Sequence, residues 1–154
     1  GRGGGAGLRA AAARLGAGDR VAWLGARPDV ERLYAAADAL VLPARYEPFG
    51  LGPLEAAQAG CALVLGDIAS LREVWADAAW FTPPGDAEAL AAALERIIAD
   101  ETLRARLSGA ARARAREFEP DRMARQYLEV YAEASAAARR AGRGRPACAE
   151  ALRS

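Results

Sequence analysis

Residues 39–60 read ALVLPARYEPFGLGPLEAAQAG, and this stretch decides the fold. Its first five residues form a short apolar run that is typical of a buried strand. Its last eight begin at Pro53 and end at Gly60, residue types that favour the first position and the end of a helix. The turn between these two runs contains Gly50 and Gly52. A strand that leads through such a turn into a helix is the repeating unit of a parallel α/β sheet.

The same alternation continues on both sides of this stretch. Short apolar runs predict further strands, and amphipathic runs between them predict helices. We therefore expect an α/β, Rossmann-like parallel sheet with helices on both faces, followed by C-terminal helices. The expected strands cover residues 21–24, 39–42, 62–65 and 79–81, and the expected helices of this part cover residues 8–15, 30–37, 53–59 and 70–75.

The second half of the sequence is expected to be helical. Asp86 follows a Pro-Pro-Gly turn and predicts a helix N-cap, and Pro120 predicts the start of a last helix. Asp67 is likewise interpreted as a cap for the helix at residues 70–75. A chain of 154 residues is the size of one domain, which we place at residues 1–138. Residues 139–154 have no periodicity and are expected to form a disordered tail.

Two glutamates, Glu47 and Glu55, flank the glycine turn with seven residues between them. Open α/β sheets bind their ligands at the carboxyl ends of the strands, which is where this turn would lie. Free amides at a helix start receive phosphate oxygens well, and glycines allow a ligand to approach the backbone. Each residue alone has an ordinary structural explanation, since first-turn glutamates and loop glycines are common. Together they indicate a site for a molecule with hydroxyls at two ends and an anion between them.

Composition excludes several classes of function. The net charge of +1 is too balanced to favour a nucleic-acid partner, and the absence of histidine excludes a histidine acid or base. Two cysteines, Cys61 and Cys148, are too few for a metal site, so no metal is predicted. Without an apolar run of membrane-spanning length, we expect a cytoplasmic protein. The arginines of residues 104–116 read as a solvated helix face, with a weak contact to the inner membrane surface as the alternative.

Residues 18–134 resemble the C-terminal, donor-binding domain of the retaining GT-B glycosyltransferases of family 4. The matching runs, in family order, are DRVAWLGARPD, RLYAAADALVLPARYEPFGLGPLEAAQAG, LVLGDIASLREVWADAAWFTPPGDAEALAAALERII and FEPDRMARQYLEVYAEA. The resemblance implies a hexosyltransferase with a nucleotide-diphosphate sugar as donor substrate and no separate cofactor. It also implies transfer to a sugar, lipid or other hydroxyl acceptor with retention of the anomeric configuration.

The resemblance also implies roles for individual residues. Glu47 would be the catalytic residue that contacts the sugar, and Glu55 would hold the ribose hydroxyls. Arg27 lies in a turn whose surroundings would meet the nucleobase, largely through backbone. The amides that would contact the sugar and diphosphate belong to Phe49, Gly50 and Leu51.

Departures from the family pattern leave alternatives open. The arginine and lysine that clamp the diphosphate in the family have no counterpart, and the sequence contains no lysine. We therefore expect a C-terminal fragment that lacks the acceptor domain and is inactive alone. A non-catalytic half-domain that serves as a partner module, and a sugar-nucleotide epimerase on the same fold, are the alternatives. The strand at residues 21–24 would lack its neighbour, so we expect an apolar edge that favours association.

Overall fold

The chain divides into two compact units, Gly1–Val30 and Glu31–Ser154, in a computed structural model that describes residues 4–142. The first unit contains helix α1 (Gly4–Arg14) and a short 3₁₀ helix, η1 (Gly18–Arg20). Within this unit the Arg9 guanidinium lies 5.3 Å from the centre of the Trp23 ring. Residues 1–30 are therefore described by themselves, and the single domain expected over residues 1–138 stays a prediction.

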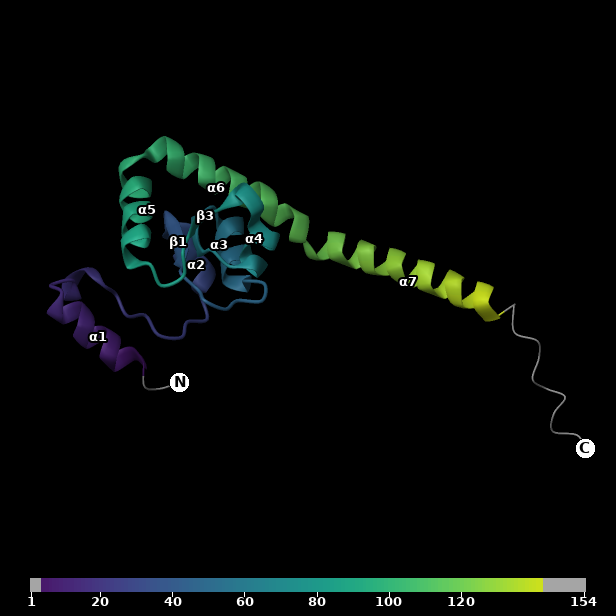
Figure 1. Ribbon diagram of the computed structural model, residues 1–154, viewed down its shortest axis with the longest axis horizontal. Helices are drawn as coiled ribbons and strands as arrows, with labels where there is room; N and C mark the ends of the chain where they lie inside the picture. Colours follow the sequence, from purple (N-terminus) through teal and green to yellow (C-terminus); the bar gives the residue numbers. More distant parts are fainter. Residues whose placement is uncertain (1–3, 143–154) are drawn as a thin grey trace, which may run out of the picture. The chain divides into compact units, whose positions relative to one another are not determined.

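The second unit is built on a parallel sheet of three strands in the order β1-β2-β3 (Figure 1). The strands are β1 (Ala39–Leu42), β2 (Ala62–Gly66) and β3 (Trp80–Thr82). In the register of the sheet, Ala39 lies beside Ala62 and Val64 lies beside Trp80. The predicted parallel sheet is confirmed, and the strands lie within a residue or so of their expected positions.

Helices connect these strands and follow the last of them, and α7 extends away from the sheet (Figure 1). They are α2 (Val30–Ala36), α3 (Leu51–Ala59), α4 (Ala69–Trp75), η2 (Ala76–Ala78), α5 (Ala87–Ala99), α6 (Glu101–Ala115), η3 (Arg116–Phe118) and α7 (Pro120–Gly142).

Strand β2 is the centre of the hydrophobic core, because all five of its residues are buried. Successive side chains of a strand point to opposite faces of the sheet. Leu63 and Leu65 accordingly pack with residues of α3, α4 and the end of α6. Ala62 and Val64 pack with residues of α5 and the start of α6 on the other face. A central strand covered on both faces needs an apolar residue at each position, which explains why the run ALVLG does not alternate.

The strand expected at residues 21–24 is absent from the structure. The segment is irregular, and Val21 and Leu24 are 39% and 51% exposed. A strand is held by ladder hydrogen bonds to a neighbour, and no described residue pairs with this segment. The predicted apolar strand edge, which was expected to favour association, is therefore wrong, because residues 21–24 form no strand.

Two helices begin earlier than predicted, and one of the two predicted helix caps is absent. Helix α3 begins at Leu51 rather than Pro53, and α1 begins at Gly4 rather than Leu8. Asp86 caps α5 as predicted, since its carboxylate accepts from the Ala89 amide at 2.9 Å. Asp67 does not cap α4. Its carboxylate pairs with Arg72, whose guanidinium binds it more strongly than a backbone amide would.

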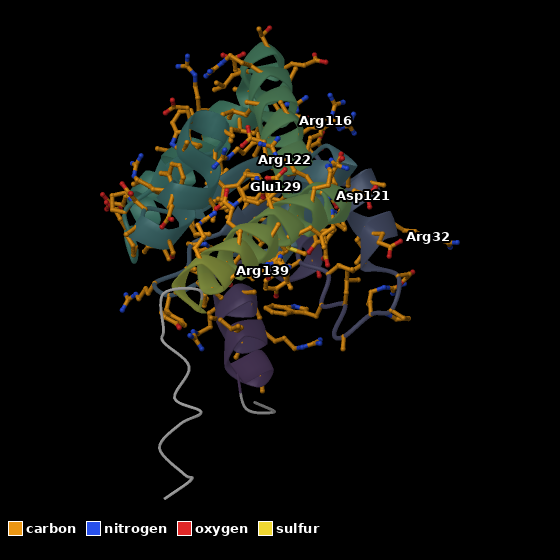
Figure 2. All side chains as sticks on the ribbon, turned by 90° about the vertical axis from the view of Figure 1, so that its right-hand side faces the viewer. Arg32, Arg116, Asp121, Arg122, Glu129 and Arg139 are labelled. Atoms are coloured by element: carbon orange, nitrogen blue, oxygen red, sulfur yellow. The ribbon has the colours of Figure 1, made fainter. Side chains whose placement is uncertain are left out.

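Helix α7 continues four residues into the segment expected to be a tail, since it ends at Gly142. Charged side chains are distributed along it, and Figure 2 labels Asp121, Arg122, Glu129 and Arg139 among them. The helix also exposes an apolar stripe that the sequence interpreted as packing. Its members are Met123, Tyr127, Val130 and Tyr131. The rest of the expected tail, residues 143–154, lies outside the described residues.

Candidate functional site

The turn between β1 and α3 lies at the carboxyl edge of the sheet and crosses the end of β2. Gly66, the last residue of β2, makes this crossing feasible. A Cβ placed on Gly66 would overlap the carbonyl oxygen of Ala44 and lie 3.0 Å from its amide nitrogen. The two backbones therefore touch directly, which fixes the height of the turn above the sheet.

Glu47 folds back onto its own turn. Its Oε1 accepts hydrogen bonds from the backbone amides of Gly50, at 2.9 Å, and Phe49, at 3.4 Å. Its carbonyl oxygen accepts a 2.5 Å hydrogen bond from the Ser70 hydroxyl on α4. The half-buried carboxylate thus occupies two of the amides that the sequence analysis assigns to the donor substrate.

Gly50 sets the direction in which α3 leaves the turn. Its φ of 87° lies in the left-handed region, where a side chain is disfavoured. A Cβ there would also approach Pro53 Cγ to 3.1 Å and Leu71 Cδ2 to 3.3 Å. Helix α3 then starts with the amides of Leu51 and Gly52, whose N–H groups have no partner within the helix. These two amides supply the donor groups that an anion would need.

Glu55 is the fifth residue of α3, so it lies in the second helical turn rather than the first as expected. Its side chain is exposed. Glu47 and Glu55 are therefore brought to the same helix start, one turned inward onto amides and the other outward into solvent. Leu51 is 67% exposed.

The two aromatic residues of the turn have different surroundings. The Phe49 ring packs edge-on against Phe118, with the ring centres 5.5 Å apart, and so anchors the turn to η3. Tyr46 is 83% exposed. The packing against Phe118 shows that Phe49 anchors the turn.

Arg27 belongs to the first unit. Its guanidinium forms two hydrogen bonds to Asp29, at 2.8 Å to Oδ1 and 2.6 Å to Oδ2. This pairing lowers the pKa of the Asp29 carboxyl, because the cation favours its charged form. The Arg27 side chain is therefore engaged within its own turn. Its expected place near a nucleobase stays a prediction.

Sequence reasoning missed two residues that shape the site. Ser70 was assigned only to the start of a helix, and its hydroxyl in fact holds the Glu47 carbonyl across 23 residues of sequence. The strand was expected to end at residue 65, so Gly66 had no predicted role. A glycine at the end of a buried strand is a general signal of close backbone approach, and that signal was available. The hydrogen bond from Ser70 to Glu47 depends on how α4 packs on the sheet, and no neighbouring residues in the sequence indicate it.

A hollow of about 380 Å³ in this unit lies beside β3. It adjoins Trp80, the first residue of β3, together with Arg72 and Arg106. Arg72 is already paired with Asp67 and stacked over the Phe81 ring at 4.5 Å. We therefore place the candidate site at the β1–α3 turn, where accessible amides and two carboxylates converge.

The fold defines a Rossmann-like α/β protein whose candidate site lies in a turn at the carboxyl edge of the sheet. Comparison with known proteins specifies the family. Residues 2–114 match the family model described as glycosyl transferases group 1. This chain belongs to the group 1 glycosyl transferases.

Individual relatives agree with that membership. The chain is 34% identical over 119 residues to O-antigen chain mannosyltransferase B of Escherichia coli. The aligned residues make up 74% of this chain and 31% of that protein. Sucrose-phosphate synthase from Thermosynechococcus elongatus superposes with a TM-score of 0.75 and 32% identity, covering 84% of this chain and 34% of that one. HepE from Anabaena, solved in complex with UDP, superposes with a TM-score of 0.77 and 28% identity. The superposition covers 82% of this chain and 36% of the HepE chain.

These structural neighbours are GT-B glycosyltransferases, which confirms the predicted fold type. The chain spans about a third of the length of the relatives it matches. Among the described residues, no helix has both the length and the apolar character that a membrane crossing requires.

Proposed function

We propose that this chain supplies the donor-binding part of a retaining family 4 glycosyltransferase, which transfers a hexose from a nucleotide-diphosphate sugar to an acceptor hydroxyl. The observation that supports this proposal best is the β1–α3 turn. It gathers the Glu47 carboxylate, the free amides at the start of α3 and the exposed Glu55 at one edge of the sheet. Family membership supports the same class of reaction.

In this proposal each group of the turn has one task. Glu55 accepts hydrogen bonds from the ribose hydroxyls, as a carboxylate with several free lone pairs can. The amides of Phe49, Gly50 and Leu51 receive oxygens of the sugar and the diphosphate. Glu47 orients the sugar once its carboxylate has left the amides, and Arg27 lies near the nucleobase.

The proposed reaction exchanges one bond at the anomeric carbon for another. The bond from that carbon to the diphosphate oxygen breaks, and a bond to the acceptor oxygen forms on the same face of the sugar. The nucleoside diphosphate departs with the bonding electrons, and its leaving oxygen accepts the hydroxyl proton of the acceptor. The contribution of this turn is to position the donor and to stabilise the departing charge with oriented amides.

The proposal requires groups from outside this sequence. The acceptor must be held by another domain, and cations for the diphosphate must be supplied in place of the lysine that the sequence lacks. We therefore expect the chain alone to bind a nucleotide sugar weakly and to transfer none. That missing cation is also the observation that favours the second candidate, a non-catalytic partner module.

The first test measures binding of UDP-glucose and GDP-mannose to the 154-residue chain by calorimetry. Replacing Glu55 with alanine should weaken binding at least tenfold, because hydrogen bonds to a charged group are worth about 1.5–3 kcal/mol. Glu88→Ala is the matched control, since it removes an exposed carboxylate from the first turn of α5 instead. Equal affinities of wild type and Glu55→Ala would contradict the assignment of the ribose to Glu55.

The second test uses the longer protein that contains this sequence. Transfer with retained anomeric configuration, read from the NMR coupling of the product, is the expected result. A product with an isomerised donor sugar and no acceptor would indicate an epimerase. Absence of any turnover, with donor binding also absent, would favour the partner module.

A further inference from the structure

Tyr34 brings a hydroxyl to the start of α3 from a different helix. It lies near the end of α2, and side chains on a helix lean toward its N-terminus. Its ring packs against the core cluster on the α3 face of the sheet, where it is half-buried. Its hydroxyl lies 3.5 Å from the position that a Cβ on Gly52 would occupy. The hydroxyl therefore lies in van der Waals range of the first turn of α3.

This placement puts the hydroxyl at the helix face that also carries Glu55. Gly52 and Glu55 are three residues apart on α3, so they are neighbours on the same helix face. The electrostatics agree with the geometry. The pKa of Tyr34 is raised first by partial burial and then by the negative charge of Glu55, with Cys61 as a further cause.

We propose that Tyr34 is a positioning residue for the ribose of the donor, acting through Glu55. In the donor-bound protein its O–H would donate a hydrogen bond to one carboxylate oxygen of Glu55 and so fix the orientation of that carboxylate. The other oxygen and the remaining lone pairs then face the ribose hydroxyls. This inference rests on the proposed function and adds a specificity element to it. A nucleoside diphosphate with both ribose hydroxyls is recognised, and one without them gains nothing from Tyr34.

The contact between Tyr34 and Glu55 can be tested without any ligand. Tyrosine labelled with ¹³C reports the titration of each phenol by NMR in the 154-residue chain. In Glu55→Gln, the pKa of Tyr34 should fall, because removing a nearby negative charge makes the phenolate easier to form. Glu88→Gln, which removes an exposed charge from α5, should leave the titration unchanged. A Tyr34 titration that is identical in wild type and Glu55→Gln would overturn the proposal.

The ribose role is tested by comparing UDP with 2′,3′-dideoxy-UDP by calorimetry. Tyr34→Phe should weaken UDP binding about tenfold and leave the dideoxy compound unaffected, a difference that a merely structural loss would not produce. Tyr127→Phe on the exposed stripe of α7 is the matched control, expected to change neither affinity. Equal UDP affinity of wild type and Tyr34→Phe would overturn this inference alone. A wild-type chain that binds UDP no better than dideoxy-UDP would overturn the ribose assignment of the proposed function as well.

Discussion

At the scale of single residues, the most consequential contact is the one between Glu47 and the amides of its own turn. A donor substrate must displace this carboxylate before it can reach the amides of Phe49 and Gly50. Replacing Glu47 with alanine should therefore free the anion-binding groups. We expect inorganic pyrophosphate to bind the Glu47→Ala chain about tenfold more tightly than wild type, as measured by calorimetry.

A control is needed because any lost carboxylate makes the chain less negative. Glu88→Ala makes the same change of charge on a different helix, and we expect less than a twofold effect, since exposed charges are largely screened beyond about 10 Å. If both variants gained affinity equally, the effect would be general electrostatics and not release of the amides. The same Glu47→Ala change should abolish sugar transfer by the longer protein, since the sugar loses its orienting group.

The residue pattern indicated a candidate site at the β1–α3 turn but not the contacts within that turn. The structure brings Glu47 and Glu55 to this turn, and their role toward a ligand stays a prediction. The bond from Ser70 to the Glu47 carbonyl joins residues that the sequence separates by 23 positions. Such a contact depends on how α4 packs on the sheet, and no local propensity encodes it.

At the scale of elements, the connection from α4 to η2 contains an unfavourable backbone conformation. Ala76 has φ 44° and ψ −118°, a region that glycine adopts far more easily than alanine. Ala76→Gly should stabilise the chain by about 1 kcal/mol, as measured by urea denaturation. Ala92→Gly, at an exposed position inside α5, is the opposite control and should destabilise by about 1 kcal/mol. Destabilisation by both changes would mean that Ala76 is unstrained.

The end of β2 offers a second prediction at this scale. Gly66→Ala places a methyl group against the Ala44 backbone, so the turn that carries Glu47 must move. We expect a loss of about 1–3 kcal/mol in stability, together with weaker nucleotide-sugar binding. Gly109→Ala is the matched control, because a Cβ there meets nothing within 4 Å. At that position in α6 the change should stabilise by about 1 kcal/mol, and both variants can be compared in one denaturation series.

Elements were predictable wherever local pattern and tertiary packing agree. Strand β1 matches its predicted residues, and Asp86 caps α5 as its turn indicated. The errors arise where a residue has a competing partner or lacks a required one. Asp67 pairs with Arg72 rather than with the start of α4. The apolar run at residues 21–24 has strand propensity, but no described strand lies beside it to complete a ladder.

At the scale of the whole molecule, burial is concentrated in the sheet. Strand β2 is buried along its length and hydrogen-bonded to β1 and β3. Exchange of its amide hydrogens should therefore require global unfolding, whereas α1 and α7, whose side chains are mostly exposed, should exchange through local opening. Hydrogen-exchange mass spectrometry of the 154-residue chain should show slow exchange in β2 and fast exchange in both terminal helices. Since Gly66→Ala weakens only the sheet unit, it should accelerate exchange in β2 and leave α1 unchanged; equal acceleration of both would show that the two units unfold together.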